Sequence, residues 1–227
     1  MEPVTFKERH TTQALPLGKA FFLFFLLICL EIGSAIVYQQ SPSAIAVPSL
    51  LFIALQRIAG VFLIVGFLAY WGYGPDRLGL SPSLFRRGLL HGILWCCGFG
   101  ALVGGVGVIL HLAGVPAHRL LGSMRMQSAR RLIAYVLVGC LIGPLVEDLV
   151  FIGIVYNALR KKLPLLLSIA IVVPLFAAAH GRISVSLVIQ ALGAILFTLS
   201  FEYSGSLLTP MIIHACGNLA ILVVQLL

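Results

Sequence analysis

Residues 132–159 read LIAYVLVGCLIGPLVEDLVFIGIVYNAL, and the only charged side chains in this run are Glu147 and Asp148. A run of about 20 apolar residues is enough for a helix to cross roughly 30 Å of hydrocarbon at about 1.5 Å per residue. The stretch therefore predicts a membrane-spanning helix that carries two adjacent carboxyl groups near its centre.

The composition of the whole chain agrees with a membrane protein. Of its 227 residues, 60% are hydrophobic and 10% are charged, and the mean hydropathy is +1.10. Ordinary soluble domains contain about 45–50% apolar and about 25% charged residues. A soluble globule is excluded, because so few charged side chains cannot cover its surface unless lipid covers the rest. An intrinsically disordered chain is excluded by the same values.

Six further stretches are apolar in the same way. Together, the expected spans are 20–39, 48–71, 88–114, 132–159, 163–180, 183–201 and 207–227. Continuous apolar runs predict helices, whereas the strands of a membrane barrel alternate apolar and polar residues over about 10 positions. We therefore expect an all-α, polytopic membrane helix bundle of about seven transmembrane helices.

Three regions are expected along the chain. They are a polar N-terminal segment at 1–18, three transmembrane helices within 19–114, and a four-helix core at 130–227. A cleaved signal peptide is the alternative for the first span, because its strongest apolar run, Phe21 to Leu30, is short and small residues follow it. Apolar residues resume at Ile36 and more spans follow, which favours a retained helix.

The net charge of +8 comes from 15 Lys and Arg against 7 Asp and Glu. The basic residues cluster between spans, as expected of loops at anionic lipid headgroups, and no stretch interleaves them with base-stacking aromatic residues. We therefore expect no nucleic-acid partner. A cytoplasmic N-terminus would place nine basic residues inside and five outside, which favours that orientation. The inside set is Lys7, Arg9, Lys19, Arg77, Arg86, Arg87, Arg160, Lys161 and Lys162, and the outside set is Arg119, Arg125, Arg130, Arg131 and Arg182.

Ionisable side chains inside the membrane need a reason, because a charge near the bilayer centre costs about 2.5–3.5 kcal/mol on insertion scales. Glu31 and Arg57 lie within the first two spans and can form a structural pair between neighbouring helices. Glu147 and Asp148 are harder to explain in this way, since ionising both would bury two like charges. Such an arrangement is typical of a general acid or base.

Two histidines and an asparagine extend this candidate site. His214 and Asn218 are four residues apart and share a helical face, and Phe176 and His180 repeat that spacing on another span. With Glu147, these groups can activate a water molecule and stabilise an oxyanion. Alternatively, each histidine bonds a neighbouring helix, or the set binds a catalytic zinc ion. Because neither HExxH nor a fourth ligand is visible, we expect no cofactor, with a divalent metal as the alternative.

Seven straight spans do not bring these residues to one depth. His180 would lie near the outer end of its span, whereas His214 lies about seven residues from the cytoplasmic end of the last span. Either the fifth and sixth spans do not fully cross the membrane, or the boundaries differ from those predicted.

Three motifs resemble those of the CPBP family of intramembrane proteases, which contains the CAAX prenyl endopeptidases and the bacteriocin-processing and immunity proteins of bacteria. The family pattern is EExxxR, then FxxxH, then HxxxN or HxxxB on a later helix. This chain reads Glu147-Asp148-Leu-Val-Phe151-Ile152, then Phe176-Ala-Ala-Ala-His180, then His214-Ala-Cys-Gly-Asn218. The resemblance covers about residues 75–227.

The resemblance implies a glutamic-type intramembrane endopeptidase with its catalytic core in the last four helices. Its partners would be the lipid bilayer and a membrane-associated or C-terminally anchored protein substrate. Glu147, assisted by His180, would activate a water, and His214 with Asn218 would stabilise the oxyanion. Asp148 would orient Glu147 or His180, and Phe176 would have a supporting role. A bacterial inner (cell) membrane is the expected location.

Two positions depart from the family pattern. Asp148 stands in place of the second glutamate, and Ile152 stands in place of the arginine, so the carboxylates need another partner or a proton. A catalytically inactive scaffold or immunity-type protein of the same fold is therefore an alternative function. An ion- or proton-coupled carrier is a further alternative, motivated by Glu31, Arg57 and Glu147, although no inverted repeat is visible.

Overall fold

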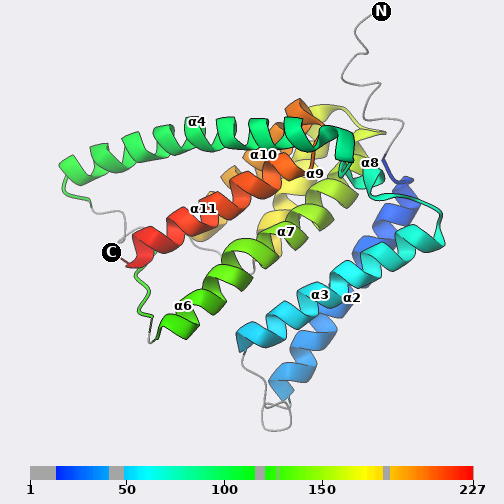
Figure 1. Cartoon of the computed structure of the whole chain (residues 1–227), viewed down its shortest axis with the longest axis horizontal. Helices are drawn as coiled ribbons and strands as arrows, with labels where there is room; N and C mark the ends of the chain where they lie inside the picture. Colours follow the sequence, from blue (N-terminus) through cyan, green and yellow to red (C-terminus); the bar gives the residue numbers. More distant parts are fainter. Residues whose placement is uncertain (1–13, 41–48, 116–120, 127, 181–184, 227) are drawn as a thin grey trace, which may run out of the picture.

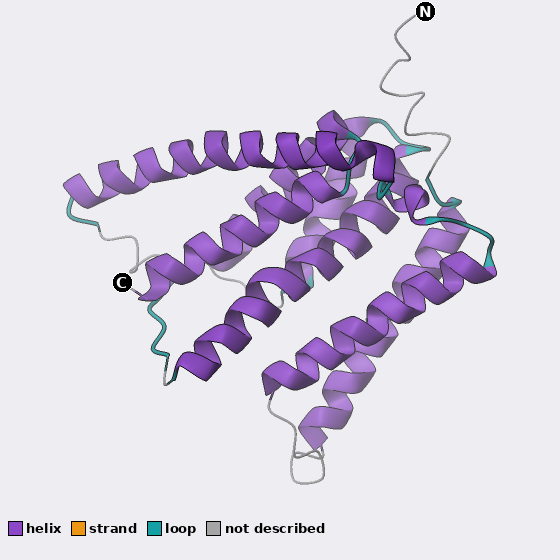
Figure 2. Cartoon of the chain, in the orientation of Figure 1, coloured by secondary structure: helices purple, strands orange, loops and turns teal. Residues whose placement is uncertain are grey.

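The structure, a computed structural model, describes residues 14–40, 49–115, 121–126, 128–180 and 185–226. Every regular element within these ranges is a helix, as Figure 2 shows. Six of the described helical segments are long and apolar enough to cross a membrane. Large apolar side chains such as Phe25 and Phe62 face outward, where a membrane protein contacts lipid. The predicted all-α, polytopic membrane bundle is confirmed.

Residues 129–160, which carry the two adjacent acids, form the central rod of the bundle (Figure 1). The rod consists of α6 (Ala129–Tyr135), η3 (Val136–Ile142), α7 (Gly143–Asp148), η4 (Leu149–Tyr156) and α8 (Asn157–Arg160). It is the most buried of the six candidate spans. Both η3 and η4 are π-helical, so the short α-helical segment with the two acids lies between two wider stretches. Such π-helical stretches are frequent at functional sites.

An N-terminal hairpin, α2 (Leu17–Gln40) and α3 (Ser49–Tyr70), packs against one side of the rod. Helix α3 contacts η3 and α7, and α2 contacts η4. Figure 1 shows the two helices lying side by side along the rod. The hairpin therefore brings the middle of α3 next to the segment with the two acids.

Helix α4 (Phe85–Leu112) follows two short 3-10 turns, η1 (Pro75–Leu78) and η2 (Pro82–Leu84), and packs mainly against α11 (Leu208–Leu226). Close packing is possible because Gly92 faces α11: a Cβ atom there would lie 3.0 Å from Cβ of Ile212. Thr209 also donates a hydrogen bond to the carbonyl oxygen of Gly88 at 3.1 Å. Small residues allow membrane helices to approach in this way.

The remaining helices explain how residues from different spans reach one depth. Helix α9 (Leu165–Ala178) has 14 residues and is about 21 Å long, less than the roughly 30 Å of hydrocarbon. It packs against α10 (Val185–Ser204) and η4. The predicted span 163–180 thus contains a helix that is shorter than the hydrocarbon layer, and His180, two residues beyond its end, reaches Glu147.

Candidate active site

Glu147 lies near the end of α7, and its two carboxylate oxygens face different partners. One oxygen, Oε2, lies 3.5 Å from Nε2 of His180 and 3.9 Å from Nε2 of His214. The other, Oε1, lies 3.4 Å from a terminal guanidinium nitrogen of Arg57. The Glu147 side chain is 15% exposed. The Glu147 carboxylate thus links α7 to α3, to α11 and to the end of the α9 segment.

His180 directly follows the short helix α9 and is held by that helix. Its Nδ1 donates to the carbonyl oxygen of Phe176 at 2.9 Å, one helical turn earlier. With the proton on Nδ1, the Nε2 atom of a neutral ring is an acceptor and points toward Glu147. The FxxxH spacing therefore fixes the orientation of the imidazole as well as its helical face.

His214 lies on α11 between the two acids. Its Nδ1 lies 3.2 Å from Oδ1 of Asp148, which has no exposed surface. We expected Asp148 to orient Glu147 or His180, but the structure pairs it with His214. The reason is the rotation of about 100° per residue in a helix, which turns adjacent acids toward different neighbours.

Asn218 lies one helical turn beyond His214, and its amide contacts the rod. Its Nδ2 donates to the carbonyl oxygen of Gly139 in η3 at 3.1 Å. This bond uses one of the two amide hydrogens and leaves the second for another acceptor. Asn218 is thus bonded to the rod that carries the acids, at a position eight residues before Glu147.

Aromatic rings pack against both histidines of the site. Phe197 of α10 stacks on His214 with the ring centroids 4.3 Å apart. Phe176 lies 5.0 Å from the ring of His180 and 5.8 Å from that of His214. Phe151 of the rod lies 5.2 Å from Phe176 in an edge-to-face arrangement. These rings fix the imidazole planes and exclude water from one side of the cluster.

Arg57 of α3 contacts the site, although the sequence indicated only that it could pair with Glu31. That pair is present, with Arg57 and Glu31 joined at 3.0 Å, and the second terminal nitrogen of Arg57 reaches Glu147. The signal for this role was the position of a lone arginine within an apolar span, which needs a buried acceptor. Ile152, in contrast, is fully buried in the apolar core.

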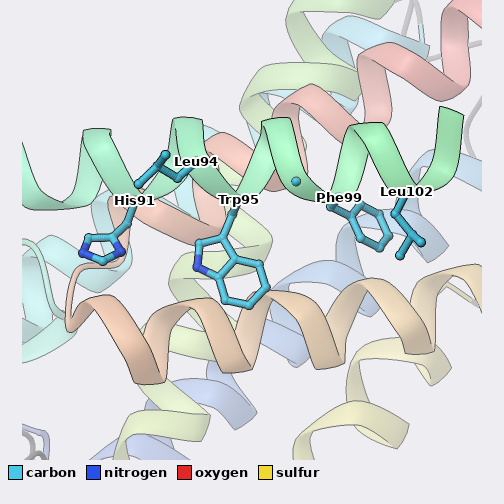
Figure 3. A pocket seen from close by; sticks show the side chains of 6 residues that line it. His91, Leu94, Trp95, Phe99 and Leu102 are labelled. Carbon is cyan, nitrogen blue, oxygen red and sulfur yellow. The ribbon is translucent and has the colours of Figure 1, made fainter. Parts of the chain in front are cut away.

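A hollow of about 370 Å³ lies elsewhere, along α4. It is lined by His91, Leu94, Trp95, Gly98, Phe99 and Leu102, and Figure 3 shows the labelled side chains along one stretch of the helix. None of the candidate site residues lines it. Among the residues that the structure describes, no group of three or more His, Cys, Asp or Glu side chains is arranged to hold a metal ion.

Comparison with known proteins finds one family to which the C-terminal region is similar. Residues 129–220 match the family model of type II CAAX prenyl endopeptidase Rce1-like proteins. The match confirms the resemblance to CPBP intramembrane proteases and supports a CAAX-type endopeptidase fold for this region. The matched segment contains all four motif residues, Glu147, His180, His214 and Asn218, but neither α2, α3 nor α4. No curated protein and no solved structure matches the chain.

Proposed function

We propose that the protein is a glutamic-type intramembrane endopeptidase that hydrolyses a peptide bond of a membrane-associated or C-terminally anchored protein. The observation that carries the proposal is the position of Glu147, whose Oε2 faces Nε2 of His180 and of His214 at 3.5 and 3.9 Å. A carboxylate between two imidazoles in an apolar bundle can take up, hold and return a proton. The family match points to the same reaction.

Glu147 and His180 form the general base. Because Nδ1 of His180 donates to Phe176, its Nε2 and the Glu147 oxygen are both acceptors unless one proton lies between them. A water molecule in contact with both can transfer its proton to this pair as its oxygen attacks the substrate carbonyl carbon. The same proton then passes to the leaving nitrogen when the tetrahedral intermediate collapses.

His214 and Asn218 stabilise the oxyanion of that intermediate. Nδ1 of His214 donates to Asp148, so a second proton on Nε2 gives the ring a donor toward the developing negative charge. The second amide hydrogen of Asn218 is available on the same face of α11. Asp148 acts as the counter-charge that holds this imidazolium in place.

The reaction proposed here uses no metal cofactor, because Glu147 and His180 supply the base and His214 supplies the electrophilic donor. A membrane-associated substrate would reach the site between helices that are long and apolar enough to cross a bilayer. The proposed cytoplasmic orientation of the N-terminus rests on the distribution of the basic residues between the spans. A cluster at the start of α2, where Lys19 contacts Trp71 and Tyr73, fits a position at a membrane–water interface. Aromatic and basic side chains of this kind are typical of the membrane–water interface.

Labelling of peptide termini in membrane proteomes tests the proposal. Cells carrying the wild type, Glu147→Ala or His180→Ala would be compared at equal protein levels. New termini that are lost in both variants identify a protease and its substrate together. His91→Ala is the matched control, because this histidine lies on α4 and lines the separate hollow. Termini that persist in both site variants would contradict the proposal and favour a non-catalytic scaffold.

A further inference from the structure

The N-terminal hairpin supplies a charged contact to the site that the matched segment itself does not contain. Arg57 lies on α3, outside residues 129–220, and joins Glu31 of α2 at 3.0 Å to Glu147 at 3.4 Å. Its side chain is only 21% exposed. A cation in this position is held between two carboxylates from different helices.

The contacts of Glu147 are divided between its two oxygens. Arg57 lies at Oε1, whereas His180 and His214 both lie at Oε2. A carboxylate fixed on one side by a guanidinium cannot rotate freely, so its other oxygen stays directed at the histidines. Arg57 therefore determines which oxygen of Glu147 is available for proton transfer.

Glu31 in turn fixes Arg57. The Arg57–Glu31 contact is the shorter of the two, and Gln56 donates to the backbone oxygen of Glu31 at 3.1 Å. The hydrogen bond of Gln56 holds the same two helices together without reaching Glu147. Gln56 thus links α2 and α3 without contacting the site, whereas Arg57 contacts Glu147, and each residue can be changed separately.

Resting on the function proposed above, we infer that Arg57 is a positioning residue for Glu147 and that the hairpin α2–α3 is required to complete the active site. Arg57 supplies a basic partner for Glu147, which the motif itself does not provide because Ile152 stands in place of its arginine. The segment from α6 to α11 would therefore be incompletely organised for proton transfer without α3. Arg57 itself touches neither the water nor the substrate.

The first test measures the termini that depend on Glu147 in cells carrying Arg57→Met, Arg57→Lys and Gln56→Met. Arg57→Met is expected to reduce them at least about tenfold, part of the roughly 10²–10⁴-fold contribution of general acid–base catalysis. Arg57→Lys should restore only part of them, because lysine keeps the charge but not the planar fork that bridges two carboxylates. Gln56→Met should lose less than Arg57→Met, because it leaves both carboxylate contacts of Arg57 in place. Equal losses in all three variants would indicate disrupted helix packing and overturn the inference.

The outcomes separate the inference from the function on which it rests. If Glu147→Ala removes the termini and Arg57→Met keeps them, the inference is wrong and the proposed function stands. If Glu147→Ala keeps them, the proposed function is wrong, and thermal unfolding of the purified chain in detergent tests the contact alone. There, Arg57→Met, Glu147→Gln and the double variant should be non-additive, because both single changes break one ion pair. Strict additivity would overturn the inference.

Discussion

Replacing Asp148 with asparagine separates catalysis from stability. The carboxylate has no exposed surface, its Oδ1 lies 3.2 Å from Nδ1 of His214, and its Oδ2 is buried with no hydrogen-bond partner. Asparagine keeps the size of the side chain and a carbonyl acceptor for His214, but it removes the charge. A hydrogen bond to a charged group contributes about 1.5–3 kcal/mol and a neutral one about 0.5–1.5 kcal/mol.

The midpoints of these ranges differ by about 1.3 kcal/mol, which corresponds to nearly a tenfold loss of rate if His214 must be an imidazolium in the transition state. The free energy of unfolding should change by less than about 1 kcal/mol in Asp148→Asn, because a buried charge and its counter-charge are lost together. Asp148→Ala should lower both the cleavage rate and the free energy of unfolding, because it leaves His214 without an acceptor. The loss of unfolding free energy is expected to be about 3–5 kcal/mol. Yields of Glu147-dependent termini and thermal unfolding in detergent measure the two effects. Full cleavage by Asp148→Asn would refute the role assigned to the charge.

Three further outcomes are expected. Gly92→Leu should destabilise the protein by about 1–3 kcal/mol, because the leucine side chain would collide with Ile212. In the same melting assay, the control Gly104→Ala should unfold like the wild type, because the space beside Gly104 is open. Asn218→Ala should cost about 1 kcal/mol of stability, since the Gly139 carbonyl loses its donor, and should lower cleavage by more than this stability loss explains. Incubation with a metal chelator should leave cleavage by purified protein unchanged, and a loss that added zinc restores would contradict the metal-free reaction.

The sequence predicted the membrane bundle because apolar run length alone determines which segments can cross a bilayer. The same rule was misleading for residues 163–180. Apolar side chains are equally required against lipid and against a protein core, so hydropathy cannot distinguish a full span from the short α9 that packs on α10 and η4. This short helix resolves the conflict of depth, because its end delivers His180 to the level of Glu147.

Residue spacing alone could not predict the contacts between helices within the site. FxxxH and HxxxN predict which side chains share a face of one helix, and the structure agrees that His180 bonds back to Phe176. Spacing does not give the rotation of one helix against another, which is why Asp148 was assigned the wrong partner. The π-helical stretches η3 and η4 add to this uncertainty, since each changes the register of the rod around α7.

Arg57 has two carboxylate partners within the bundle, Glu31 and Glu147. The pairing with Glu31 satisfies one end of the guanidinium, and a purely structural role would end there. A guanidinium, however, presents five donors in a planar fork and can bridge two carboxylates, which a lysine in the same place could not do with the same geometry. The second contact, to Glu147, places the N-terminal hairpin in the organisation of the site. A variant that retains α6 to α11 but loses α2 and α3 should for this reason keep the four motif residues and still lose the fixed orientation of its base.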